Sequence, residues 1–212
     1  MTSCTFERFT KDVELHQLTV LKDDGLHRHL KVAKPNTNSM HYNITTWPGY
    51  LCISGDMGCF TFYRLTDMFE FFRGTPGAIN PTYWEEKVQA GAGHSGANAI
   101  TSEPDFDAYE TRLKEYLAEF VESLDPQDES EAQKIEEATD AVSNFINSYE
   151  RSEYDVVFRI NEWDSSDAGG MELVDFWDCG LDKFRFHYIW CCYAIVHAIH
   201  MYDTLKAGEV AA

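Results

Sequence analysis

The stretch that decides the fold is YLCISGDMGCFTFYR, residues 50–64. In it, Leu51 and Ile53 alternate with small or polar neighbours, and Phe60 and Phe62 do the same. Apolar residues at every second position are typical of strands in an antiparallel sheet with one buried face. Because Gly-Asp-Met-Gly separates the two runs, the sequence predicts a β-hairpin.

More runs with the composition of short strands lie N-terminal to this hairpin. They cover residues 16–21, 26–33 and 41–46. Together with the hairpin they predict an antiparallel sheet of about five strands in a sheet-rich half, residues 1–74. A short helix after Thr66 has large apolar residues at helical spacing, so we expect it to pack on this sheet.

The period of the apolar residues changes after residue 103. From about 105 to 123, and again from about 129 to 148, apolar residues recur every three or four positions, which is typical of amphipathic helices. The sequence therefore predicts an acidic, antiparallel helical pair over 103–150. The short apolar run that follows, 156–160, either extends the second helix or forms a strand.

The most apolar stretch, 182–205, predicts a helix that is apolar nearly all round and forms the core helix of the fold. Three histidines within it favour a buried helix over one that spans a membrane. His197 and His200 are spaced i, i+3, but no other ligand motif accompanies them, so we expect no metal site. Together these elements predict an α+β fold in a single domain, residues 1–212.

Composition indicates a cytoplasmic protein. Residues 1–10 lack the apolar run of a secretory signal. None of the six cysteines belongs to a CxxC pair, so free thiols in a reducing compartment are expected.

Net charge excludes several partners. The chain carries 36 Asp and Glu against 17 Lys and Arg, a formal net charge of −19. A protein that neutralises nucleic-acid phosphates, or docks on an anionic membrane, needs a basic face instead. The charge is also regional: residues 1–100 hold 10 acidic and 9 basic residues, whereas 103–178 hold 23 and 5. This asymmetry indicates either a partner-binding surface or a solvated helical face that keeps the protein soluble.

Carboxylates on the two predicted helices are the candidate partner-binding residues. They are Asp107, Glu110, Glu115, Glu119, Glu122, Glu131, Glu136, Glu137 and Asp140. At spacings of i, i+3 and i+4 they lie roughly 5–6 Å apart, comparable to phosphates along a nucleic-acid strand. The sequence contains no nucleophile-elbow, Walker or dinucleotide-binding motif, so we assign no catalytic residue and no cofactor.

Three segments carry a resemblance to known proteins. They are ITTWPGYLCISGDMG at 44–58 (followed by Phe60 and Phe62), MFEFF at 68–72 and FHYIWCCYAIV at 186–196. Here the chain resembles a family of small accessory proteins encoded by tailed phages and prophages, mostly of unassigned function. The resemblance is clearest over 26–73 and 175–203. It implies a bacterial host cytoplasm and brings no catalytic residues.

This context favours one hypothesis for the acidic surface. Phage accessory proteins of this size and charge often block host defence, including CRISPR effectors, whose basic grooves hold guide RNA and DNA. Carboxylates can occupy such a groove by matching its potential. The sequence therefore predicts an anti-defence, anti-CRISPR-like inhibitor that mimics DNA toward a basic nucleoprotein, without binding nucleic acid or membrane directly.

Two alternatives stay open. The first is a phage enzyme, or a binder of a small ligand or signal nucleotide, with a site between sheet and helices near Asp56, His27, His29 or Trp47. The second is a homo-oligomeric structural or regulatory protein, in which exposed aromatic residues at Tyr83 and Trp84 serve an interface.

Overall fold

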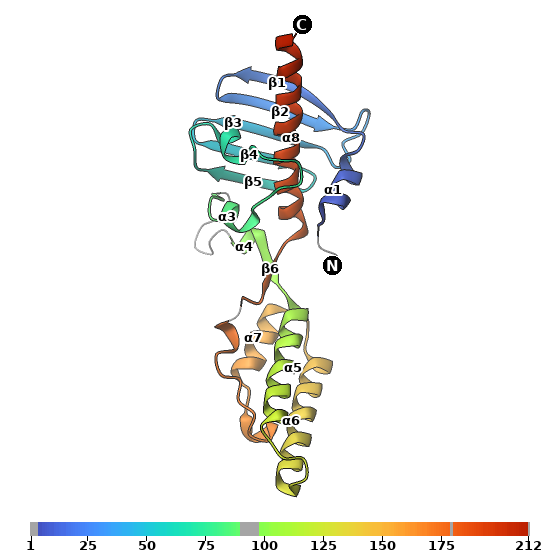
Figure 1. Cartoon of the computed structure of the whole chain (residues 1–212), viewed down its shortest axis with the longest axis vertical. Coiled ribbons are helices and arrows are strands. Elements are labelled where there is room, and N and C mark those ends of the chain that lie inside the picture. The colour runs from blue at the N-terminus through green and yellow to red at the C-terminus, as the bar shows by residue number, and fades with distance from the viewer. Residues whose placement is uncertain (1–3, 90–97, 179, 212) are drawn as a thin grey trace. The chain divides into compact units, whose positions relative to one another are not determined.

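The computed structural model describes residues 4–89, 98–178 and 180–211. The chain divides into two compact units, a sheet unit (residues 1–103 and 184–212) and a helical unit (residues 104–183), as Figure 1 shows. Each unit has a hydrophobic core of its own. The prediction of a single domain over residues 1–212 does not anticipate this division.

Five antiparallel strands form the sheet, each paired with the next along the chain. They are β1 (Gln17–Asp24), β2 (His27–Ala33), β3 (Tyr42–Trp47), β4 (Tyr50–Gly55) and β5 (Gly58–Tyr63). The register runs from Gln17 opposite Ala33 to Gly55 opposite Gly58. The predicted five-stranded sheet and the α+β fold class are confirmed.

Two glycines make the tight turn between β4 and β5 possible. Gly58 has a φ of +114°, a conformation that residues with a Cβ rarely adopt. At Gly55, an added Cβ would lie 2.2 Å from the backbone oxygen of His41, so no side chain fits there. The hairpin predicted from Gly-Asp-Met-Gly is therefore formed, with a backbone that needs both glycines.

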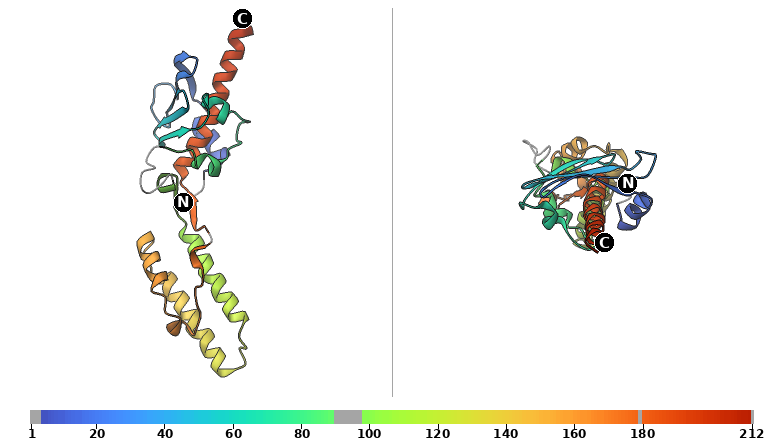
Figure 2. Two further views of the ribbon diagram at one scale, coloured as in Figure 1. Left: turned by 90° about the vertical axis from the view of Figure 1, so that its left-hand side faces the viewer. Right: turned by 90° about the horizontal axis from the view of Figure 1, so that it is seen from above.

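Helices pack on one face of this sheet (Figure 2). They include α1 (Phe6–Val13), α2 (Met68–Phe72) and α8 (Phe186–Ala211). Tyr188 and Trp190 of α8 are fully buried, and the Trp190 ring meets the Tyr42 ring of β3 nearly edge-on at 5.6 Å. Burial of such large rings is a main stabilising contribution to this core.

Shorter elements connect the sheet to the helical unit. They are α3 (Pro81–Glu85), α4 (Asn98–Thr101), β6 (Ser102–Pro104) and β7 (Asp182–Phe184). β6 and β7 pair with each other, so α8 begins at Phe186 rather than near residue 182. Among the helices of the described residues, none is both long and apolar enough to cross a membrane.

Three helices make up most of the helical unit: α5 (Phe106–Glu122), α6 (Glu129–Ser148) and α7 (Glu153–Asn161). Leu113 of α5 and Val142 of α6 are buried in a common core together with Phe176. The predicted helical pair is present, and α6 has the predicted bounds. α7 is a separate helix because the Ser152 side chain caps it, accepting a hydrogen bond of 3.2 Å from the Asp155 N–H.

Candidate functional site

Negative charge is concentrated in the helical unit. Residues 104–183 contain 23 Asp and Glu against 6 Lys and Arg, a net charge of −17. The rest of the chain contains 13 against 11, a net charge of −2. A field of this kind attracts basic surfaces and repels nucleic acid.

A row of carboxylates lies along the outer side of α5. Glu115, Glu119 and Glu122 are exposed, and their spacing places them on one side of the helix. Tyr109 and Leu113 are buried on the opposite side. The core contacts of α5 therefore keep this row directed toward solvent.

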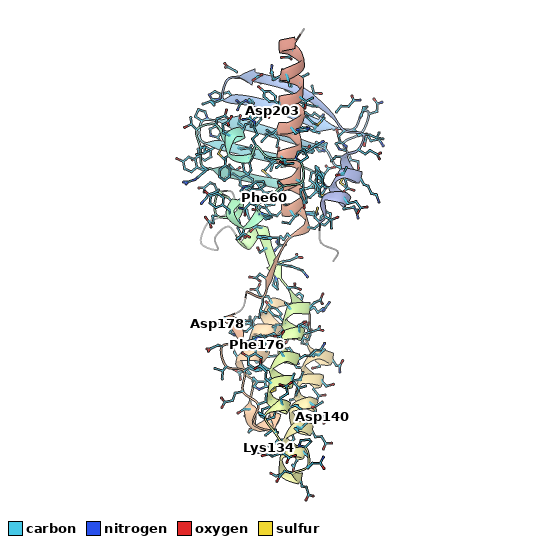
Figure 3. All side chains as sticks on the ribbon, viewed as in Figure 1. Phe60, Lys134, Asp140, Phe176, Asp178 and Asp203 are labelled. Atoms are coloured by element: carbon cyan, nitrogen blue, oxygen red, sulfur yellow. The ribbon has the colours of Figure 1, made fainter. Side chains whose placement is uncertain are left out.

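A second, shorter row lies on α6. Glu136 and Asp140 are exposed and one turn apart, with Asp140 labelled in Figure 3. Ala138 and Val142 are buried toward the core of the unit. Because each helix turns its own outer side to solvent, the carboxylates form two rows on two helices.

The nine predicted carboxylates differ in how far they are already engaged. Within the part of the chain that the structure describes, the side chains of four of them make no hydrogen bond or ion pair: Glu119, Glu122, Glu136 and Asp140. The other five have a partner in the helical unit: Asp107, Glu110, Glu115, Glu131 and Glu137. Ion pairs with Arg compensate the charges of Asp107, Glu110 and Glu115, whereas Glu131 and Glu137 only accept hydrogen bonds from neutral groups. The first four are the ones whose side chains have neither kind of contact.

Arg151 explains why two of the nine are engaged. Its guanidinium binds Asp107 and lies 3.1 Å from a Glu110 carboxylate oxygen. The Tyr149 hydroxyl donates a further hydrogen bond of 2.8 Å to Glu110. These contacts join the segment after α6 to α5, so Asp107 and Glu110 have a structural role that spacing along one helix does not reveal.

An exposed apolar face on α7 was not predicted from the sequence. Tyr154, Val157 and Phe158 are 80%, 38% and 53% exposed, and they occupy positions i, i+3 and i+4 of one helical face. The Tyr154 and Phe158 rings are nearly parallel, with centroids 6.4 Å apart. We call these three residues the α7 patch.

Two hollows adjoin the α7 patch. One, of about 490 Å³, is lined by the three patch residues and by Glu153, Asn161 and Glu162. The other, of about 290 Å³, lies between α6, α7 and the turn that follows, and Phe158 and Glu162 line both. Phe158 therefore stands between two depressions that apolar side chains of a partner can fill.

The signal for this patch is present in the sequence of α7. Five of its nine residues are large and apolar: Tyr154, Val156, Val157, Phe158 and Ile160. Val156 and Ile160 are buried, which satisfies the single stripe that a surface helix needs. The remaining three lie outside that stripe, and apolar residues beyond those the core needs indicate a second apolar face on the helix.

Three of the residues proposed for a site between sheet and helices lie on the face of the sheet away from the helices. Leu30 and Ile44 are buried toward the helices, so His27, His29 and Trp47, in the alternate positions, lie on the opposite face. On the helix-covered side, buried apolar residues fill the space between the layers.

Asp56 and the two aromatic residues proposed for an interface, Tyr83 and Trp84, have different surroundings. The Asp56 carboxylate accepts a hydrogen bond of 2.7 Å from the Met40 N–H. Trp84 is buried and packs edge-on against Phe72, so it is not the exposed aromatic that was expected, whereas Tyr83 is 38% exposed.

His197 and His200 have different surroundings on α8. His197 Nδ1 is hydrogen bonded to the Tyr42 hydroxyl at 2.7 Å, and burial lowers the pKa of His197 to about 4. His200 is exposed. His197 is thus a neutral, hydrogen-bonded core group at physiological pH.

Comparison with known proteins adds no relative. No protein-family model matches the chain, and neither the curated proteins nor the solved structures include a significant match.

Proposed function

We propose that the helical unit is a protein-docking module that binds a basic partner. The α7 patch carries this proposal, because three large apolar residues exposed on one helical face are unusual on a surface that needs no partner. The patch supplies the apolar anchor, and the uncompensated carboxylates of α5 and α6 attract and orient the partner.

Charge indicates what kind of partner fits. The rim of the patch carries Glu153 and Glu162, and the hollow beside it is also lined by Asp164 and Asp167. A second copy of this chain would bring another unit of net charge −17 to the same surface, and the like charges would repel. A segment with apolar side chains flanked by Lys and Arg fits this surface, because its apolar side chains can pack on the α7 patch and its cations can pair with the surrounding carboxylates.

The finer form of the proposal concerns the partner's own function. Basic surfaces with apolar contacts are typical of proteins that bind nucleic acid. We propose that the chain acts as an inhibitor that occupies such a surface in a host defence complex, as expected for a phage-encoded accessory protein. The carboxylates of the helical unit would then compete with nucleic acid for the same basic groups.

A defined probe tests the docking chemistry. It is a Leu/Lys peptide of about 18 residues, or five helical turns, compared with a peptide of the same composition whose scrambled order abolishes the apolar face. We expect the full chain to bind the amphipathic peptide more tightly. Tyr154→Ser with Phe158→Ser should remove that preference, while Val174→Ser, at another exposed apolar position of this unit, should preserve it.

Charge reversal tests the role of the carboxylates. Glu119, Glu122, Glu136 and Asp140 are changed together to Lys, since none has a partner to lose. Binding of both peptides should weaken, and its dependence on salt should flatten. The control reverses Asp24, Glu14, Glu86 and Glu209, which are exposed in the sheet unit and give the same change in net charge. Three of them also lose an exposed ion pair, with Lys22, Lys87 and Lys206, so stability is measured alongside binding.

The same variants test the proposal that the chain inhibits a host defence complex. Affinity capture from phage-infected bacteria should retain a basic nucleic-acid-binding complex on the wild type and on both controls, and lose it on both test variants. If the patch variant and the charge-reversal variant bind the peptides and retain that complex as the wild type does, the proposed function is wrong.

A further inference from the structure

A groove lies on the open face of the sheet, at residues that belong to the sheet unit alone. It has a volume of about 580 Å³ and lies where β1 and β2 meet the loop 34–38. Gln17, Thr19 and Lys31 alternate with the buried or half-buried Leu18, Val20 and Leu30, so they face away from the helices. Because Gln17 pairs with Ala33, the strands bring the loop next to β1.

Uncompensated cations distinguish this groove. Twelve of the 17 Lys and Arg residues form ion pairs with carboxylates within the described residues; the exceptions are Lys31, Lys34, Arg64, Lys114 and Lys134. Two of those five, Lys31 and Lys34, line the groove together. In a chain with twice as many acidic as basic residues, two lysines without a carboxylate partner in one groove are an exception.

Neutral polar side chains complete the lining. Amide groups come from Gln17, Asn36 and Asn38, and hydroxyl groups come from Thr19 and Thr37. The lining contains no carboxylate. The side chains of Gln17, Thr19 and Asn36 make no hydrogen bond within the residues that the structure describes, so their donors and acceptors are free for a ligand.

We infer that this groove binds a small ligand with an anionic group on a polyhydroxylated body, such as a phosphorylated or carboxylated sugar. Lys31 and Lys34 would hold the anion through charge-assisted hydrogen bonds. The amides and the Thr19 hydroxyl would bind the ligand's hydroxyl groups, and Leu21 and Pro35 would contact its apolar faces.

Size and charge both favour a small ligand over a polyanion. A volume of about 580 Å³ lies within the usual range for small-molecule sites. A nucleic acid would extend beyond the two lysines and meet the field of a chain with a net charge of −19. A small anion neutralises the local cations without that penalty.

Titration of the full chain, followed by the backbone amide signals in NMR, tests the inference. The probes are glucose 6-phosphate and glucuronate, which differ in the anion. Glucose, which lacks an anionic group, and inorganic phosphate, which lacks the sugar, are titrated for comparison. We expect at least one of the two anionic sugars to bind with a Kd of about 1 mM or tighter and to shift the amides of Gln17, Thr19 and residues 36–38. Binding of both would assign a general anion site, and binding of one would identify the anion.

Matched lysine variants locate the binding. Lys31→Gln and Lys34→Gln should each weaken it about tenfold, as expected for loss of a charge-assisted hydrogen bond. Lys22→Gln makes the same change in net charge on the same sheet face, at a lysine paired with Asp24, and should leave the affinity within about twofold. The inference is overturned if neither anionic sugar binds, if the shifts map to other residues, or if the three variants behave alike. None of these results depends on the helical unit.

Discussion

Arg28 and Asp67 form a bidentate ion pair that joins β2 to the start of α2. Nη1 of Arg28 lies 2.8 Å from Oδ1 of Asp67, and Nη2 lies 2.9 Å from Oδ2. The guanidinium also lies over the Phe69 ring, 4.4 Å from its centroid. The two side chains are only 11% and 25% exposed, so water screens the pair weakly.

Loss of this pair should destabilise the sheet unit. We expect Arg28→Met to lower the free energy of unfolding by about 2–3 kcal/mol, because a half-buried carboxylate loses its partner. Urea unfolding at neutral pH measures the change. Lys11→Met is the control: Lys11 and Glu7 form an ion pair that is 75% and 85% exposed, so its loss should have no measurable effect.

The same pair predicts a response to acid. Hydrogen bonds from Arg28 hold the pKa of Asp67 below its ordinary value of 3.8. Because the unfolded chain takes up this proton first, the contribution is complete at neutral pH and is lost as the pH falls below about 4. Arg28→Met should therefore flatten the acid limb of the stability profile, and an unchanged limb would contradict this assignment.

His197 should produce a second pH dependence at higher pH. Its pKa is about 4 in the folded chain, compared with an ordinary value of 6.5, so the unfolded state binds the proton first between these values. The free energy of unfolding should fall by about 2–3 kcal/mol as the pH decreases from about 6.5 to about 4. His197→Asn retains a hydrogen-bonding group near Tyr42 without the titration and should remove this slope, whereas His200→Asn, at an exposed position, should not.

The two faces of α7 should respond differently to substitution. Val156→Ala and Ile160→Ala remove buried side chains and should destabilise the helical unit by about 1–3 kcal/mol each. Tyr154→Ser and Phe158→Ser change exposed side chains, so each should alter stability by no more than about 0.5 kcal/mol. Thermal unfolding followed by circular dichroism separates the two cases. A large loss at Tyr154 would mean that the patch supports the fold.

Thiol labelling should follow burial. Cys59 is exposed and its Sγ lies 3.7 Å from that of Cys52 on the open face of the sheet, whereas Cys4 and Cys191 are buried. Burial raises the pKa of the Cys4 thiol to about 11. In a Cys179→Ser background, an aromatic disulfide reagent should modify Cys59 first and spare Cys4 and Cys191 until the chain unfolds. Early labelling of Cys191 would show that the core of the sheet unit opens readily.

Local patterns in the sequence were sufficient for most of the fold. Alternating apolar residues and turn glycines predicted the strands around Gly55 and Gly58, because both signals act over a few residues. The type of α7 stayed open, since apolar residues at 154, 156, 157, 158 and 160 suit a helix or a strand. The Ser152 cap decides between them.

The candidate sites depend more on contacts between distant residues. Charge counts located the acidic unit, yet only the folded chain shows that Arg151 engages Asp107 and Glu110, about 40 positions earlier along the sequence. The groove likewise exists because strand pairing brings Gln17 next to Ala33 and the loop that follows it. Neither relationship has a signature within a short window of sequence.

The helical unit interrupts the sheet unit in the sequence, which has a consequence for synthesis. Residues 104–183 leave the ribosome before α8, and α8 supplies Tyr188, Trp190 and Ile195 to the core beneath the sheet. All the residues of the helical core have emerged by then, while the sheet still lacks its central helix. Translation therefore lets the helical unit fold first, and the sheet is completed only by residues made about 120 positions after its last strand.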